Sequence, residues 1–148
     1  LPTPELGKIW LEKVRLVQDA AKRNYYNSEW FMWVDAGNAL YRDKKPSSKP
    51  WPGHEIRLPT DKIIYTGSSY KDVDDGHEHD FAGTVFMYHK SMCDKVAQLF
   101  YEQFELCSEE TNNWTCGSDQ CIFSEIKKRK PELFIRVGEG YGNLLKNI

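Results

Sequence analysis

The first residue with clear chemical potential is Asp35, which ends an unbroken apolar run at residues 30–34. Apolar residues without alternation are typical of a strand covered on both faces, as in a mostly parallel sheet. In open α/β sheets, ligands bind beyond the carboxyl ends of the strands. Asp35 is therefore placed to hold a divalent cation or a ligand hydroxyl. Alternatively, it caps the following turn by accepting hydrogen bonds from backbone N–H groups around Gly37.

The second candidate is Asp119, which follows Ser118 at the start of an expected helix. A carboxylate in the first turn is favoured by the positive end of the helix dipole, and this alone can explain its presence. The functional alternative is a general base that the helix holds toward a pocket beyond the strands. The adjacent Gln120 would then hydrogen-bond a substrate hydroxyl, or else face water.

A third group of ligand-type side chains lies in the acidic stretch at residues 72–80, which contains His77 and His79. Its acids do not follow the spacing of a calcium-binding loop. No third ligand stands at a spacing typical of a zinc site. We expect a solvated acidic loop, with a lid or a supplementary metal ligand as the alternative.

Aromatic residues make up 14% of the chain, and side chains such as Trp51 and Trp114 could stack on sugars. Ordinary cores also use aromatic residues, and the core role is the one we expect, with sugar stacking as the alternative. Cys107 and Cys116 could form a disulfide that closes the loop between them. A glycosylation sequon begins at Asn113 in the same loop, which would suit the secretory-pathway lumen. A cytoplasmic location is equally open.

Alternating helices and strands must position these residues. Thr3 is expected to cap a helix at residues 4–23, which feeds a strand at 30–35. Further strands are expected at residues 62–65, 81–89 and 133–137, and further helices at 91–107 and 118–130. This order predicts an α/β domain with a mixed sheet. Because a helix precedes the first strand, the sequence suggests a piece of a longer chain.

Length and charge exclude several classes of protein. A chain of 148 residues predicts one domain, residues 1–148, with a substantial core. The net charge of −2 argues against a protein that binds nucleic acid through phosphate contacts. No apolar run approaches the ~20 residues that span a bilayer. The motifs of dinucleotide enzymes, P-loop NTPases, serine hydrolases and HExxH metalloproteases are also absent.

Several sequence blocks, in their order and spacing, resemble the HtrL/YibB-like glycosyltransferase family across nearly the whole chain. These blocks are IWLEKV at residues 9–14, WFMWVDAG at 30–37, FAGTVF at 81–86, GSDQ at 117–120 and KPELF at 130–134. The resemblance implies a GT-A-type fold with a mixed, mostly parallel sheet flanked by helices. In this chain the N-terminal nucleotide-binding strands of that fold would be missing.

The same resemblance implies a nucleotide-sugar donor, a glycan or other hydroxyl acceptor, and a divalent cation, Mn²⁺ or Mg²⁺. Asp35 would be the metal ligand, and the cation would neutralise charge on the departing diphosphate. Asp119 would be the catalytic base that deprotonates the acceptor hydroxyl. Gly83, Thr84 and Gln120 would contact the donor.

The sequence thus predicts a glycosyltransferase that transfers a sugar from a nucleotide donor to a hydroxyl group with the help of a metal. The alternative is a non-catalytic carbohydrate-binding or assembly module that uses the aromatic loops around Trp51 and Trp114. A third interpretation is a metal-dependent hydrolase that uses His77 and His79.

Overall fold

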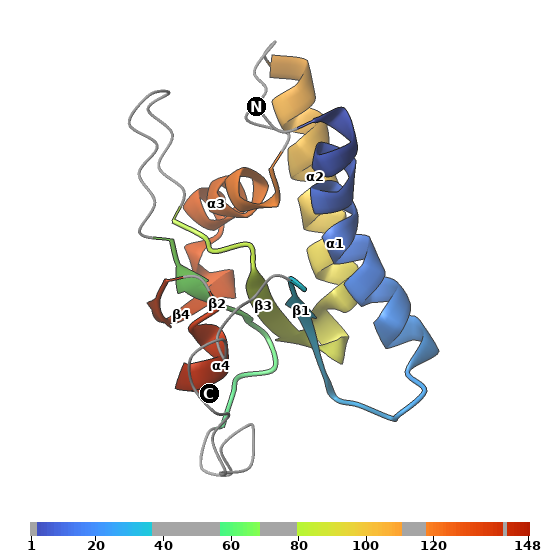
Figure 1. Cartoon of the computed structure of the whole chain (residues 1–148), viewed down its shortest axis with the longest axis vertical. Helices are drawn as coiled ribbons and strands as arrows, with labels where there is room; N and C mark the ends of the chain where they lie inside the picture. The colour runs from blue at the N-terminus through green and yellow to red at the C-terminus, as the bar shows by residue number, and fades with distance from the viewer. Residues whose placement is uncertain (1–2, 37–56, 69–79, 111–117, 141) are drawn as a thin grey trace.

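The computed structural model describes residues 3–36, 57–68, 80–110, 118–140 and 142–148. Figure 1 shows helices packed around a central sheet. In chain order, the elements of these residues are α1 (Pro4–Arg23), β1 (Trp30–Val34), β2 (Ile63–Gly67), β3 (Val85–His89), η1 (Lys90–Met92), α2 (Cys93–Glu110), α3 (Asp119–Arg129), η3 (Pro131–Leu133), β4 (Phe134–Glu139) and α4 (Leu144–Asn147).

The strands form one mixed sheet in the order β1-β3-β2-β4. β3 is antiparallel to both β1 and β2, whereas β2 and β4 are parallel. β1, β2 and β4 therefore run in one direction and β3 runs in the other. The mixed sheet agrees with the prediction, but only one pair of neighbouring strands in the described sheet is parallel. The carboxyl ends of β1, β2 and β4 and the amino end of β3 lie at the same end of the sheet. We call this end of the sheet, where these strands begin or end, the ligand edge.

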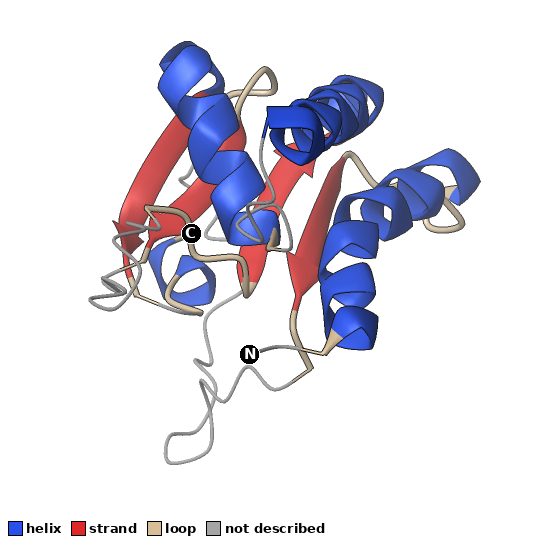
Figure 2. Cartoon of the chain, turned by 90° about the horizontal axis from the view of Figure 1, so that it is seen from above, coloured by secondary structure: helices blue, strands red, loops and turns tan. Residues whose placement is uncertain are grey.

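Helices cover both faces of the sheet (Figure 2). Phe86 and Tyr88 of β3 face one side, where they pack in the same core as residues of α1, α2 and α3. Val85 and Met87 face the other side, where they pack with Leu144 of α4. This alternation follows from the two-residue period of a strand. The face under α1, α2 and α3 is called the helical face below.

α1 begins as the sequence predicts. Pro4 is its first residue, and the Thr3 hydroxyl accepts a hydrogen bond from the backbone N–H of Leu6. The helix buries Val14 and Val17 against the core, and it also buries Lys13. A lysine is rarely buried unless it is paired, so Lys13 requires partners inside the protein.

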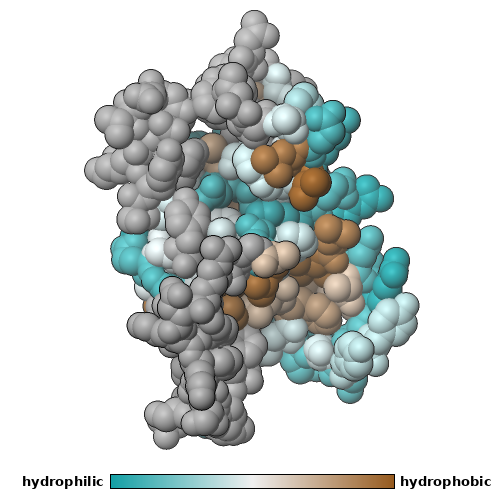
Figure 3. All heavy atoms as spheres, viewed as in Figure 1, coloured by the Kyte–Doolittle hydropathy of each residue, from teal (hydrophilic) through white to brown (hydrophobic). Residues whose placement is uncertain are grey.

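β1 differs from the expectation of a strand covered on both faces. It is an outer strand of the described sheet. Its first four residues are half-buried, and Val34 is exposed. The reason is topological, because β3 is its one partner strand among the described residues and pairs with it in antiparallel register. Figure 3 shows hydrophobic surface in this region, beside α1.

Other element boundaries also differ from the prediction. β3 begins at Val85 rather than at residue 81, because Phe81 leaves the sheet and stacks between the rings of Tyr65 and Phe123. η1 precedes α2, and the His89 side chain caps η1 by accepting a hydrogen bond from the backbone N–H of Ser91. Residues 138–139 extend β4 beyond its predicted end, and the short α4 follows, which the sequence did not predict. None of the helices in the described ranges is long and apolar enough to cross a membrane.

Candidate functional site

Asp35 lies at the ligand edge, one residue beyond β1. Its backbone N–H donates to the carbonyl of Thr84 at 2.9 Å, which extends the β1–β3 ladder by one step. Because side chains alternate along a strand, Asp35 shares a side with Trp33, which packs on the helical face. The indole N–H of Trp33 donates a 2.6 Å hydrogen bond to Asp35 Oδ1. The Asp35 side chain is 32% exposed, so it still reaches the surface.

Asp119 is the first residue of α3, as predicted. The Ser118 hydroxyl accepts a hydrogen bond from the backbone N–H of Gln120 and caps the helix. The amino end of α3 lies over the ligand edge, where the Gln120 amide donates to the Phe81 carbonyl at 3.0 Å. Asp119 is only 2% exposed. A helix terminus thus places a carboxylate in the interior beside the residues that lead into β3.

Lys13 joins the two predicted acids. Its ammonium nitrogen lies 3.1 Å from Asp35 Oδ1 and 3.1 Å from Asp119 Oδ2. It also donates a 3.0 Å hydrogen bond to the carbonyl of Gly83. We call these four residues the Lys13 cluster. Lys13 was not identified from the sequence as a site residue. Its position on the apolar stripe beside Val14 and Val17 is the signal that could have identified it.

Gly83 is required by close packing at this point. A Cβ atom on Gly83 would lie 2.5 Å from Asp119 Oδ2 and 2.8 Å from Gln120 Cγ. The absence of a side chain therefore lets α3 approach the segment before β3. Thr84 follows, and its hydroxyl is buried with no hydrogen-bond partner among the described residues. Contact of Gly83, Thr84 and Gln120 with a donor sugar stays a prediction.

Burial and the neighbouring charges of the Lys13 cluster bring the pKa of Asp119 close to neutral pH. Burial raises the pKa of Asp119 from 3.8 to about 6, the Lys13 ammonium opposes this rise, and the Asp35 charge adds to it. The carboxyl group is therefore mostly ionised at pH 7 but accepts a proton at slightly lower pH. Such a pKa suits a general base that works near neutrality.

The described residues do not fit a divalent cation at Asp35. Metal sites of the expected kind need several oxygen ligands. No group of three or more His, Cys, Asp or Glu residues in the described ranges is arranged to hold a metal. Asp35 Oδ1 already contacts the Lys13 ammonium and the Trp33 indole. A cation bound there would lie beside the positive charge of Lys13.

Some predicted residues lie outside the described ranges. These are Gly37, the aromatic residues Trp51 and Trp114, the sequon at Asn113, and the acidic stretch with His77 and His79. The proposed Cys107–Cys116 disulfide also involves a residue outside those ranges. The roles predicted for all of these residues, including the disulfide, stay predictions.

A second charged group lies at the ligand edge, beyond β2 and β4. Asp80 pairs with Lys127 of α3 and, at 3.3 Å, with Arg136 of β4. Arg136 also pairs with Glu139, and the Lys127 ammonium lies 5.4 Å from the centre of the Tyr65 ring. Burial lowers the pKa of Lys127. These charges balance one another, which favours a structural role in closing the end of the sheet.

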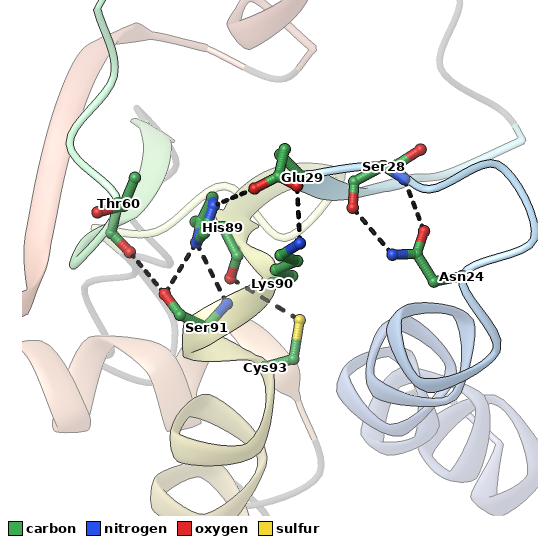
Figure 4. A network of polar contacts seen from close by, with 8 residues as sticks. All are labelled: Asn24, Ser28, Glu29, Thr60, His89, Lys90, Ser91 and Cys93. Atoms are coloured by element: carbon green, nitrogen blue, oxygen red, sulfur yellow. Dashed lines mark hydrogen bonds and ion pairs between the residues drawn. The ribbon is translucent and has the colours of Figure 1, made fainter.

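A third polar network lies at the end of the sheet opposite the ligand edge, where β1 begins and β3 ends (Figure 4). Glu29 pairs with Lys90 at 2.7 Å and with His89 Nε2 at 3.1 Å. His89 Nδ1 lies 2.8 Å from the Ser91 hydroxyl, which in turn donates to the Thr60 carbonyl. The network connects the start of β1 to the start of η1. We interpret it as a structural network that holds the start of β1 against the start of η1.

A cavity of about 370 Å³ lies away from the Lys13 cluster, at the carboxyl end of α1. Its walls come from α1, the connection to β1, and β1 itself. The lining includes Leu16, Arg23, Tyr25, Tyr26 and Phe31. None of the predicted site residues contributes to this cavity, so it provides no support for their roles.

Comparison with known proteins found no matching family model, curated protein or solved structure. The class of protein that the fold and site define is therefore a mixed α/β domain with two carboxylates and a lysine at the ligand edge of its sheet.

Proposed function

We propose that this chain is a glycosyltransferase-like domain that transfers a sugar from a nucleotide-sugar donor to an acceptor hydroxyl. The observation that carries the proposal is the convergence of Asp35 and Asp119 on one lysine at the ligand edge. Both acids were predicted from separate parts of the sequence, and the fold brings them together. In addition, they lie where α/β sheets bind their ligands.

The two carboxylates would have different tasks. Asp35 is partly exposed and would accept hydrogen bonds from ligand hydroxyls. Asp119 has a pKa of about 6 and would take the proton from the acceptor hydroxyl as it attacks the donor sugar. The new bond forms between the acceptor oxygen and the anomeric carbon, and the bond to the nucleoside diphosphate breaks. Asp119 is buried, so the proposal requires that the acceptor reach it past the partly exposed Asp35.

The test is a transfer and donor-hydrolysis assay with a panel of UDP-hexoses, on the wild-type chain and two variants. Asp119→Asn removes the base and keeps the size of the side chain, so we expect turnover to fall roughly 10²–10⁴-fold. Asp94→Asn is the matched control, since Asp94 is an exposed aspartate in the first turn of α2. The control should retain wild-type turnover.

The results separate the proposal from its alternatives. Equal turnover in Asp119→Asn and wild type would refute the assigned base. If the chain binds glycan but no nucleotide, the non-catalytic carbohydrate-binding module becomes the better interpretation. Activity that disappears only when His77 and His79 are both replaced would favour the metal-dependent hydrolase.

A further inference from the structure

We infer that the Lys13 ammonium supplies, within this site, the positive charge that the family resemblance assigns to a divalent cation. The inference rests on the proposed function, because it concerns how the same site tolerates an anionic donor. Its starting point is the position of Lys13, which the sequence did not identify as part of the site.

The contacts of Lys13 resemble the coordination of a bound cation. Three oxygen atoms from three separate segments surround the ammonium nitrogen: Asp35 Oδ1, Asp119 Oδ2 and the Gly83 carbonyl, at 3.0–3.1 Å. The Gly83 carbonyl accepts a hydrogen bond from this ammonium, whereas the two carboxylates form ion pairs with it. Asp119 Oδ2 accepts no hydrogen bond from the described residues, so its interaction with Lys13 is one of charge. The Lys13 nitrogen also lies 5.6 Å from the centre of the Trp33 ring, within cation–π range. The ammonium is therefore fully surrounded.

The charge balance of the Lys13 cluster supports the same role. Two carboxylates without Lys13 would repel the diphosphate of a nucleotide sugar. With Lys13 the cluster carries a net charge of −1 when both acids are ionised, and it is neutral when Asp119 is protonated. Lys13 thus removes half of the negative charge when both acids are ionised and all of it when Asp119 is protonated. It acts through Asp35 and Asp119 and is a positioning residue for them.

The inference predicts that metal binding and Lys13 exclude each other. In the wild-type chain, a divalent cation at Asp35 would lie next to a fixed positive charge and would have to displace it. Replacement of Lys13 by methionine keeps a side chain of similar length and removes the charge. The freed oxygens of Asp35 and Asp119 would then form a cation site that the wild-type chain lacks.

The experiment measures Mn²⁺ binding by titration calorimetry, with no nucleotide present. Wild type and Asp35→Asn should bind Mn²⁺ equally, whether weakly or not at all. A loss of Mn²⁺ affinity of tenfold or more in Asp35→Asn would overturn the inference, because Asp35 would then be a metal ligand. This comparison does not require turnover, so a failure of the proposed function and a failure of this inference are distinguishable.

A second measurement uses thermal unfolding with and without Mn²⁺. Lys13→Met should gain a Mn²⁺-dependent rise in Tm, which the Lys13→Met/Asp35→Asn double variant loses. Lys22→Met is the matched control, because Lys22 lies on the same helix and is exposed; its Tm should not respond. The absence of a rise in folded Lys13→Met would contradict the inference. If Lys13→Met does not fold, the comparison of wild type with Asp35→Asn decides.

Discussion

Lys13 and Asp119 form an ion pair at 3.1 Å, and both side chains are almost completely buried. One comes from the middle of α1 and the other from the first residue of α3. Burial of a charge is costly unless an opposite charge accompanies it. The pair therefore couples the stability of the fold to the arrangement of the candidate site.

The first prediction concerns Lys13→Ala. This change leaves Asp119 and Asp35 without their shared cation, so we expect the free energy of unfolding to fall by about 3–5 kcal/mol. Chemical denaturation at pH 7 measures the change. Addition of Asp119→Asn should recover part of the loss, since it removes one uncompensated charge. The control Lys22→Ala should stay within ~0.5 kcal/mol of wild type, and a similar loss in the control would contradict the prediction.

The second prediction concerns pH and stability. The pKa of Asp119 is raised from 3.8 to about 6 in the folded protein, so the folded state holds a proton that the unfolded state releases between these values. Stability from this group is therefore complete below pH 3.8 and is lost as the pH rises to about 6, by about 3 kcal/mol. Denaturation midpoints of wild type and Asp119→Asn between pH 4 and pH 7 measure it. Parallel pH profiles for the two proteins would refute it.

The third prediction concerns pH and turnover. If Asp119 is the base, it works only when ionised, so turnover should rise as the pH passes through about 6. A pH–rate profile of sugar transfer tests this relation. Residual turnover in Asp119→Asn should lose the inflection. An unchanged inflection in that variant would assign the titration to another group.

The fourth prediction concerns Gly83→Ala. The new methyl group would meet Asp119 and Gln120, so α3 must shift away from the segment before β3. We expect a loss of about 1–3 kcal/mol in the free energy of unfolding, as for other overpacked sites. Gly7→Ala in α1 is the control, and it should be neutral or stabilising by up to about 1 kcal/mol. Equal stability of Gly83→Ala and wild type would show that the contact relaxes freely.

The fifth prediction concerns Trp33→Phe. Phenylalanine keeps most of the ring area but cannot donate the 2.6 Å hydrogen bond to Asp35. We expect a modest loss of stability, about 0.5–1.5 kcal/mol, and a larger effect on donor binding because Asp35 loses its fixed orientation. Calorimetric titration with UDP, compared with the stability change, separates the two effects. A variant that binds UDP as well as wild type would show that the indole does not position Asp35.

The starts of two helices, which depend on neighbouring residues, were predicted correctly. The Thr3 cap with Pro4, and the Ser118 cap with Asp119, follow from hydrogen bonds that span two or three residues. By contrast, the edge position of β1 and the departure of Phe81 from β3 depend on partners far along the chain. The short α4 carries too few residues for a periodic pattern to identify it.

The sequence by itself determined the chemical groups of the candidate site and the elements that carry them. Asp35 follows a strand and Asp119 begins a helix because the residues around them favour those local structures. Only the tertiary structure decided that both acids contact Lys13, because their distance depends on the packing of α1 and α3 on one face of the sheet. Helix periodicity places Lys13 on an apolar stripe but does not say which charges lie opposite. Those partners are set by long-range packing, which a single sequence does not display.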